Sequence, residues 1–296
     1  MSEDPNLSWK TQADFASARL KALFRNLLAF LTGQPNDLLA FEAVREKLHI
    51  GGPIYRGVRT VSIAQIVGSV DRYRDFDRAF LPKQDFMAER WQKVTRAWYQ
   101  DISLPPILLY KVGEVYFVVD GHHRVSVARE KGQEAIEAEV RECAVRVPLT
   151  AEINPDDLEV LGARAEFLER TNLDRLRPDA RVAVTILGGY ERMLEHIAVH
   201  RYFMGLEFQR DVADEEAVAH WYDTVYLPIM NVIRESEILA AFTGRTEADF
   251  YLWVLDHRHY LVAQGQAHLV EPGQAAEEFL RAYFAGQANP TEELKE

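Results

Sequence analysis

The segment from Val115 to Lys131 constrains the fold of this chain more than any other. It begins with the apolar run Val115–Val119, which is rich in β-branched and aromatic residues, as buried strands are. The run enters Asp-Gly-His-His-Arg at positions 120–124, and a helical pattern then continues to Lys131 and ends at Gly132. The segment therefore predicts a strand, a tight glycine turn and a helix in direct succession.

Further patterns surround this segment. The run Ile107–Tyr110 lies four residues before it, separated by Lys-Val-Gly-Glu, and this spacing predicts a β-hairpin. We expect a last strand at Ala135–Val140, a helix from about Asp85 to Tyr99, and a short strand and turn between Tyr55 and Val67. Together these elements predict a small α/β domain over residues 55–148.

The N-terminal region is predicted to be helical. Apolar residues recur at helical spacings, and Gly33-Gln34-Pro35-Asn36 then ends the pattern. These residues are Trp9, Phe15, Leu20, Leu23, Phe24, Leu27, Leu28 and Leu31. We expect an amphipathic helix, followed by a second short helix at Asp37–Leu48, that packs on the neighbouring domain; a separate interaction arm is the alternative.

Beyond Pro148 the patterns are helical, with Val182–Leu187 as the one expected strand. Helices are expected at residues 156–170, 192–204, 215–235, 246–261 and 274–284. Thr246 is expected to cap one of them, and an aromatic core is expected from Tyr202, Phe203, Trp221, Tyr222, Tyr226, Tyr251 and Trp253. The predicted organisation is an N-terminal helical segment (1–54), the α/β domain (55–148), an all-α domain (149–286) and a tail (287–296).

Composition limits the class of protein. At 296 residues and 48% hydrophobic content, the chain can form one large core or two ordinary ones. Its apolar runs are far shorter than the roughly 20 residues that cross a bilayer, and its polar, acidic N-terminus is unlike a signal peptide. The single cysteine, Cys143, excludes an internal disulfide and a cysteine-rich zinc site. We therefore expect a cytoplasmic protein with no membrane segment.

Charge is unevenly distributed along the chain. Residues 1–148 hold 21 Lys/Arg against 19 Asp/Glu, whereas residues 149–296 hold 13 against 27. An acidic surface repels a phosphate backbone, so only the first half is suited to a polyanion. Its central cations keep DNA binding as an alternative: Arg72, Arg74, Arg78, Lys83, Arg90, Lys93 and Arg96.

The motif at positions 120–124 carries groups suited to phosphate chemistry. Gly121 would let the backbone approach an anion closely, and the free amides at a helix start favour phosphate. Arg124 supplies a bidentate fork, while His122 and His123 can donate hydrogen bonds or shuttle protons. Asp120 could order a histidine, a sugar hydroxyl or a hydrated metal. The same residues also fit an ordinary turn whose histidines cap the helix, and the spacing alone leaves both interpretations open.

Residues 55–148, with this motif at their centre, resemble the ParB/sulfiredoxin superfamily. In that fold a strand enters a Gly-x-His-Arg or Gly-x-Arg-Arg loop, which opens a helix and holds nucleotide phosphates; the matching stretch here is Val118–Arg129. Leu104–Leu109 is similar to the strand that precedes the family's motif strand, and Ser62–Asp71 to its opening strand and turn. The Asp-Gly-His-His-Arg form is particularly similar to the ADP-dependent free serine kinases.

The sequence differs from two branches of this superfamily, the sulfiredoxins and the partitioning ParB proteins. Sulfiredoxins have a cysteine where this chain has His122, and Cys143 lies a strand away, so thiol chemistry of that kind is not expected. Partitioning ParB proteins carry Glu-Arg-Arg after the glycine, followed by a helix-turn-helix domain. Here the downstream half is acidic and shows no recognition helix, so chromosome partitioning is not expected either.

The resemblance implies binding of a nucleoside di- or triphosphate (ATP, ADP or CTP), with Mg²⁺, and hydrolysis or phosphoryl transfer to a small acceptor. It assigns phosphate binding to Gly121, His122, His123, Arg124 and Ser126. It assigns catalysis to Asp120, His123 and Asp71, with Asp75 and Asp77 as weaker candidates for the base. The alternative is a non-enzymatic, ParB-like DNA-binding or transcription-regulatory protein that uses the same pocket as a ligand switch.

The second half is similar to an uncharacterised bacterial helical domain found beside kinase-like or ParB-like domains. The similar stretches are 200–203, 226–228 and 244–253, and no activity follows from them. His196 and His200 are four residues apart, and His257 and His259 lie near another helix end, which is a conceivable metal-ligand spacing. Because the His-Glu-x-x-His pattern is missing, we expect core or interface histidines and no metal site.

Overall fold

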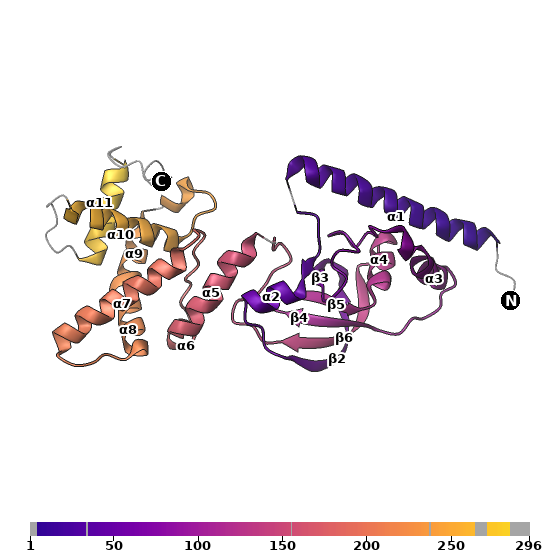
Figure 1. Ribbon diagram of the computed structural model, residues 1–296. Coiled ribbons are helices and arrows are strands. Elements are labelled where there is room, and N and C mark those ends of the chain that lie inside the picture. The colour runs from indigo at the N-terminus through magenta and orange to yellow at the C-terminus, as the bar shows by residue number, and fades with distance from the viewer. Residues whose placement is uncertain (1–4, 34, 155, 237, 264–270, 285–296) are drawn as a thin grey trace. The chain divides into compact units, whose positions relative to one another are not determined.

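The chain divides into two compact units, residues 1–158 and 159–296, in the computed structural model. The model describes residues 5–33, 35–154, 156–236, 238–263 and 271–284 (Figure 1). The side chains of residues 259–263, 282 and 284 are not among the described features. Each unit is treated separately below.

The first unit is built on a mixed six-stranded sheet with the order β1-β3-β5-β4-β6-β2. Pairing is parallel for β1 with β3, β3 with β5, and β4 with β6, and antiparallel for β4 with β5 and β2 with β6. The strands are β1 (Leu39–Ala40), β2 (Pro53–Ser62), β3 (Ile66–Ser69), β4 (Ile107–Val112), β5 (Val115–Asp120) and β6 (Ala135–Cys143). The helices of this unit are α1 (Pro5–Thr32), α2 (Phe41–Lys47), α3 (Ala88–Tyr99) and α4 (His122–Glu130).

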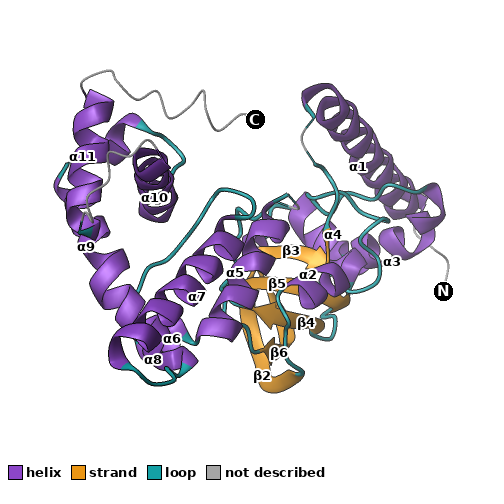
Figure 2. Cartoon of the chain, turned by 60° about the vertical axis from the view of Figure 1, so that its left-hand side comes forward, coloured by secondary structure: helices purple, strands orange, loops and turns teal. Residues whose placement is uncertain are grey.

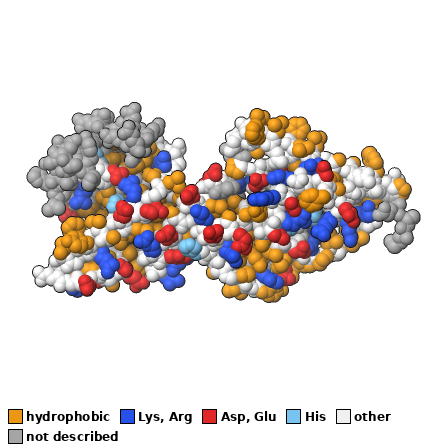
Figure 3. Space-filling view, viewed as in Figure 1, with side chains coloured by type: hydrophobic (Ala, Val, Ile, Leu, Met, Phe, Trp, Pro, Cys, Tyr) orange, Lys and Arg blue, Asp and Glu red, His pale blue; other side chains and the backbone are white. Residues whose placement is uncertain are grey.

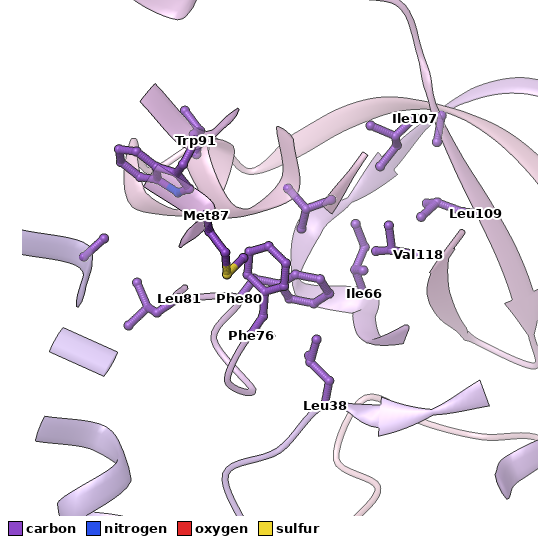
Figure 4. Close-up of a cluster of buried hydrophobic side chains, with 14 of the residues drawn as sticks. Leu38, Ile66, Phe76, Phe80, Leu81, Met87, Trp91, Ile107, Leu109 and Val118 are labelled. Atoms are coloured by element: carbon purple, nitrogen blue, oxygen red, sulfur yellow. The ribbon is translucent and has the colours of Figure 1, made fainter. Parts of the chain in front are cut away.

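The main core lies between one face of the sheet and helices α1, α3 and α4 (Figures 1 and 4). Trp91 of α3 is fully buried there, together with Phe76, Phe80 and Met87 from the connection between β3 and α3. Helix α2 packs Phe41 against aromatic rings of β4 and β5. The sheet is therefore covered by helices that precede its first strand or connect its strands, as Figure 2 also shows for α1 to α4.

The sequence patterns at the centre of this unit are confirmed. Strands β4 and β5 form the expected antiparallel hairpin around Gly113, and β5 leads directly into α4. The last strand, expected from Ala135 to Val140 or slightly beyond, is also confirmed, and β6 extends to Cys143. The short helix expected from Asp37 begins only at Phe41, because Leu39 and Ala40 instead pair with Gly68 and Ser69 of β3.

Helix α1 forms as predicted, but the face it buries is not the expected one. Its buried residues are Thr11, Phe15, Ala18 and Ala22. Of the eight apolar residues that predicted the helix, all except Phe15 are exposed to solvent. The helix therefore packs on the domain as predicted, but through Phe15 and the small residues Ala18 and Ala22 rather than through its leucines, because small residues allow that face to approach the core.

The second unit is helical in its described parts. Its helices are α5 (Asp157–Thr171), which begins in the first unit, α6 (Leu173–Leu176), α7 (Gly189–Phe208), α8 (Asp214–Trp221), α9 (Leu227–Glu235), α10 (Glu247–Ala263) and α11 (Pro272–Phe284). One π-helical turn, Tyr222–Tyr226, joins α8 to α9 without a break. Within the described residues, no helix of either unit combines the length and the apolar content needed to cross a bilayer.

The strand expected at Val182–Leu187 does not form. Its backbone instead bonds to side chains: the Val184 N–H donates to the Tyr190 hydroxyl, the Thr185 N–H donates to Asp249, and the Ala183 carbonyl accepts from Thr246. The segment is apolar because Val182 and Val184 are buried among helices. Apolar alternation alone could not distinguish this arrangement from a strand.

The expected aromatic core is confirmed in part. Trp221, Tyr226, Tyr251 and Trp253 are buried, and the Trp221 indole donates to the Tyr251 hydroxyl at 2.9 Å. Tyr202 and Phe203 are instead exposed on α7. The cap expected at Thr246 is present, since its hydroxyl accepts from the Asp249 N–H at 3.3 Å.

Candidate functional site

Gly121 stands between β5 and α4 with a φ of 101°, a left-handed conformation that side chains other than glycine rarely adopt. A Cβ at this position would lie 2.3 Å from Cγ2 of Ile107 on β4. The missing side chain therefore faces the sheet. The turn and the packing on Ile107 each require glycine at this position.

A cleft of about 490 Å³ opens at this turn. It brings together residues from four parts of the first unit: the loop after β3, helix α3, the segment before β4, and the end of β5 with the motif. Its polar lining consists of Asp71, Arg72, Arg90, Lys93, Asp120, His122, His123 and Arg124. Ser126 lies elsewhere, because its buried hydroxyl accepts a hydrogen bond from the Trp91 indole at 2.9 Å.

His122 is held rigidly at the base of the cleft. Its Nε2 shares a 2.7 Å hydrogen bond with the hydroxyl of Ser69, which also accepts from the Arg72 N–H. The Phe76 ring stacks on the imidazole with centroids 6.0 Å apart. Burial lowers the pKa of His122 to about 4, against the opposing attraction of the Asp71 carboxylate. His122 is therefore neutral at pH 7.

His123 is neutral for a similar reason. Burial, and next the positive charge of Arg72, lower its pKa to about 4. An Arg72 guanidinium nitrogen lies 3.3 Å from Nε2, and because arginine only donates, Nε2 must accept. The proton then sits on Nδ1, which is buried without a hydrogen-bond partner among the described residues. Neither histidine therefore carries a charge to offset a phosphate.

Arg124 is tied into the fold. Its guanidinium donates to the carbonyl oxygens of Pro105 and Pro106 and to Asp120 Oδ2, the last at 2.7 Å. These bonds fasten the first turn of α4 to the segment before β4. The Asp120 carboxylate is in turn committed to Arg124. The pair lines the cleft, but most of its bonding capacity is already used within the protein.

The available positive charge comes from α3. Arg90 and Lys93 are exposed and line the same cleft, and neither has an ion-pair partner among the described residues. They lie three positions apart, so they project from one side of the helix. From the sequence, Arg90 and Lys93 were predicted only as candidate DNA-binding cations, and they were not placed with the motif at positions 120–124. No spacing rule connects them with residues 120–124, because the β4–β5 hairpin lies between.

The three carboxylates considered as the catalytic base differ in their exposure and contacts. Asp71 is exposed at the cleft, with Oδ1 3.7 Å from His122 Nε2. Asp75 forms an ion pair with Arg72 at 2.7 Å. Asp77 is fully buried, accepts from the N–H groups of Ala79 and Leu81, and shapes a turn. Of these three carboxylates, only Asp71 can reach a molecule in the cleft.

Several of the cations considered for DNA binding already form hydrogen bonds or ion pairs within the first unit. Arg78 bonds to Asn154 and Ile153, Lys83 to Asp37, and Arg72 to Asp75 and His123. These contacts hold loops of the first unit together. They leave a small cationic rim at α3, formed by Arg90 and Lys93, and the exposed Arg74.

The histidines weighed as metal ligands have other contacts. His196 bonds to the Tyr251 hydroxyl at 3.2 Å, and His200 bonds to His220 at 2.8 Å. The His257 ring packs on Phe279, whereas the side chain of His259 lies outside the described residues. Among the described residues, no three candidate ligands come together to hold a metal ion.

A larger groove of about 1130 Å³ lies elsewhere, beside α1. Most of its charged lining already contacts other parts of the protein, since Lys21 pairs with Glu130, Arg25 with Asp77, and Arg129 bonds to the carbonyls of Ile63 and Ile66. The smaller cleft is therefore the better candidate site.

In comparisons with known proteins, no protein-family model and no curated protein matches this chain.

Proposed function

We propose that the cleft at the start of α4 binds the phosphate groups of a nucleoside di- or triphosphate. The observation that carries this proposal is that the first turn of α4 opens on the same cleft as the exposed cations Arg90 and Lys93. Within the described residues no side chain caps that turn. Free amides, the positive end of a helix dipole and two exposed cations make a suitable environment for an anion.

The charge around the cleft supports an anionic ligand. Four cations line it against two carboxylates, and Asp120 is already neutralised by Arg124. The neutral His122 and His123 line the cleft without repelling a cationic cofactor. The strand, glycine turn and helix match the element on which the chain resembles the ParB/sulfiredoxin superfamily, and we propose membership of that superfamily on this basis.

A second pocket suggests where the rest of the ligand lies. It has a volume of about 250 Å³ and shares Val94, Leu104, Pro105 and Arg124 with the phosphate cleft. The remainder of its lining is mostly apolar, including Trp98, Ile102 and Ile136. A flat base with a phosphorylated sugar has one apolar and one anionic end, which suits two such adjoining pockets.

The chemistry we propose is phosphoryl transfer to a small acceptor, or hydrolysis, with Asp71 as the acting carboxylate. Asp71 is free to accept a proton from a hydroxyl, while His122 beside it is fixed by Ser69. Asp71 also fits Mg²⁺, which is commonly held by one or two carboxylates together with phosphate oxygens and water. A bound Mg²⁺ would reduce the negative charge of the phosphates.

Binding is tested by calorimetry of the full chain with ATP, ADP, CTP, GTP and inorganic phosphate. We expect one nucleotide to bind and the double variant Arg90→Ala/Lys93→Ala to weaken it at least about tenfold, since two phosphate-facing charges are lost. The matched control is Arg45→Ala/Lys47→Ala, which removes two exposed cations from α2, away from the cleft. Equal loss of affinity in both variants, or no binding by wild type, would contradict the proposal.

Turnover is tested separately with Asp71→Asn. We expect this variant to retain nucleotide affinity without Mg²⁺ but to lose phosphoryl transfer or hydrolysis, because an amide cannot take up the proton. Wild-type protein that binds a nucleotide without any turnover would instead support a ligand-switched regulator.

A further inference from the structure

Helix α1 has two apolar faces, and only one of them is covered. The buried face consists of Thr11, Phe15, Ala18 and Ala22. The opposite face is exposed along the whole helix, and Figure 3 shows hydrophobic side chains gathered over this part of the first unit. Its large members are Trp9, Leu20, Leu23, Phe24, Leu27, Leu28, Phe30 and Leu31.

The exposed face follows a heptad repeat. Ala13, Leu20 and Leu27 are seven residues apart, and Trp9, Ala16, Leu23 and Phe30 form a second series with the same period. The two series alternate at spacings of four and three, which is the a/d pattern of a coiled coil. All seven residues are exposed. We call these seven residues the α1 seam.

The charges of α1 are all engaged within the first unit. Arg19 pairs with Asp85, Lys21 with Glu130, Arg25 with Asp77 and Asp14 with Lys131, while Lys10 lies 4.0 Å above the Tyr99 ring. A helix that binds an anionic membrane or an acidic partner needs free cations on its polar side. All five charged side chains of α1 already contact residues of the first unit. The partner must therefore present an uncharged apolar surface to the exposed face of α1.

The area of the face is also large enough for a stable dimer. Trp9 and Phe30 are 73% and 84% exposed, and the other six large residues are each more than half exposed. At roughly 100 Å² each, the five large residues of the α1 seam, together with Phe24, Leu28 and Leu31 beside it, supply about the 800 Å² per partner that stable interfaces bury. A monomer rarely leaves an apolar patch of more than about 600 Å² in water.

We propose that the chain self-associates by packing the α1 seam against the α1 seam of a second copy. The heptad spacing lets leucines of one helix insert between those of the other, as in two-stranded coiled coils. The phosphate cleft is not lined by any residue of the seam, so this association is independent of the proposed nucleotide binding.

Analytical ultracentrifugation of the full chain over a range of concentrations tests this inference. We expect a monomer–dimer equilibrium that Leu20→Glu/Leu27→Glu weakens on the order of 100-fold or more, because two carboxylates would be buried in each apolar seam. Leu20→Ile/Leu27→Ile should retain the dimer. Both positions are exposed in the single chain, so circular dichroism should show unchanged helix content in each variant.

The control is Val199→Glu/Leu206→Glu, which makes the same change at two exposed apolar positions of α7. A wild-type monomer at all concentrations would overturn the inference, as would a dimer that persists in the Leu20→Glu/Leu27→Glu variant. Monomeric protein that binds phosphatidylcholine vesicles through these same residues would also overturn it and would identify a lipid surface as the occupant.

Discussion

Gly121 is the residue on which the geometry of the cleft most depends. Replacing it with alanine places a Cβ against Ile107 and forces an unfavourable φ, so we expect Gly121→Ala to lower the free energy of unfolding by about 2–5 kcal/mol. Gly132→Ala is the matched control, since its φ is 71° and no atom lies within 4 Å of its added Cβ. Urea unfolding followed by fluorescence measures both. Equal losses would show that only the backbone conformation matters.

His122 and His123 link stability to pH. Their folded pKa values of about 4 lie below the ordinary value of 6.5, so the unfolded chain takes up protons first as the pH falls. Their contribution is complete above pH 6.5 and is lost as the pH falls towards 4, by on the order of 3 kcal/mol for each histidine. His122→Gln keeps a partner for Ser69 but cannot titrate. We therefore expect its unfolding midpoint to fall less steeply over this range, and a slope equal to wild type would refute the argument.

At the scale of elements, the Asp249 side chain accepts hydrogen bonds from the segment 182–187, which does not pair with a strand. Its carboxylate accepts from the N–H and hydroxyl of Thr185 and from the N–H of Thr246, so it joins the segment 182–187 to the start of α10. Asp249→Ala should cost about 3 kcal/mol, because buried donors lose a charged acceptor. Glu247→Ala, in the same turn, removes only a partly exposed pair with Arg234 and should cost less than about 1 kcal/mol. Hydrogen exchange of the Thr185 amide provides the readout; unchanged protection in Asp249→Ala would contradict this assignment.

Sequence patterns predicted local elements better than they predicted what those elements contact. The β4–β5 hairpin and the turn into α4 depend on alternation and a single glycine, which are local properties. Helix α1 was found by its period, but its large apolar residues pointed to the wrong face, because a helix with small residues on one side and leucines on the other can bury either. The partners of Arg124, and the meeting of Arg90 with the motif, depend on long-range folding and left no periodic signal.

Over the whole molecule, the distribution of charge argues against stable binding to duplex DNA. Residues 149–296 hold 13 Lys/Arg against 27 Asp/Glu, and in the first unit Arg72, Arg78 and Lys83 are committed to internal contacts. The exposed cations Arg74, Arg90 and Lys93 offer too few phosphate contacts to withstand physiological salt, since each contact displaces about one counterion. We expect any mobility shift of a DNA duplex at 50 mM salt to disappear at about 200 mM, whereas nucleotide binding should weaken far less. A shift that survives 200 mM salt and is removed by Arg90→Ala/Lys93→Ala, but not by Arg45→Ala/Lys47→Ala, would show instead that the cationic rim of the cleft is a DNA-binding surface.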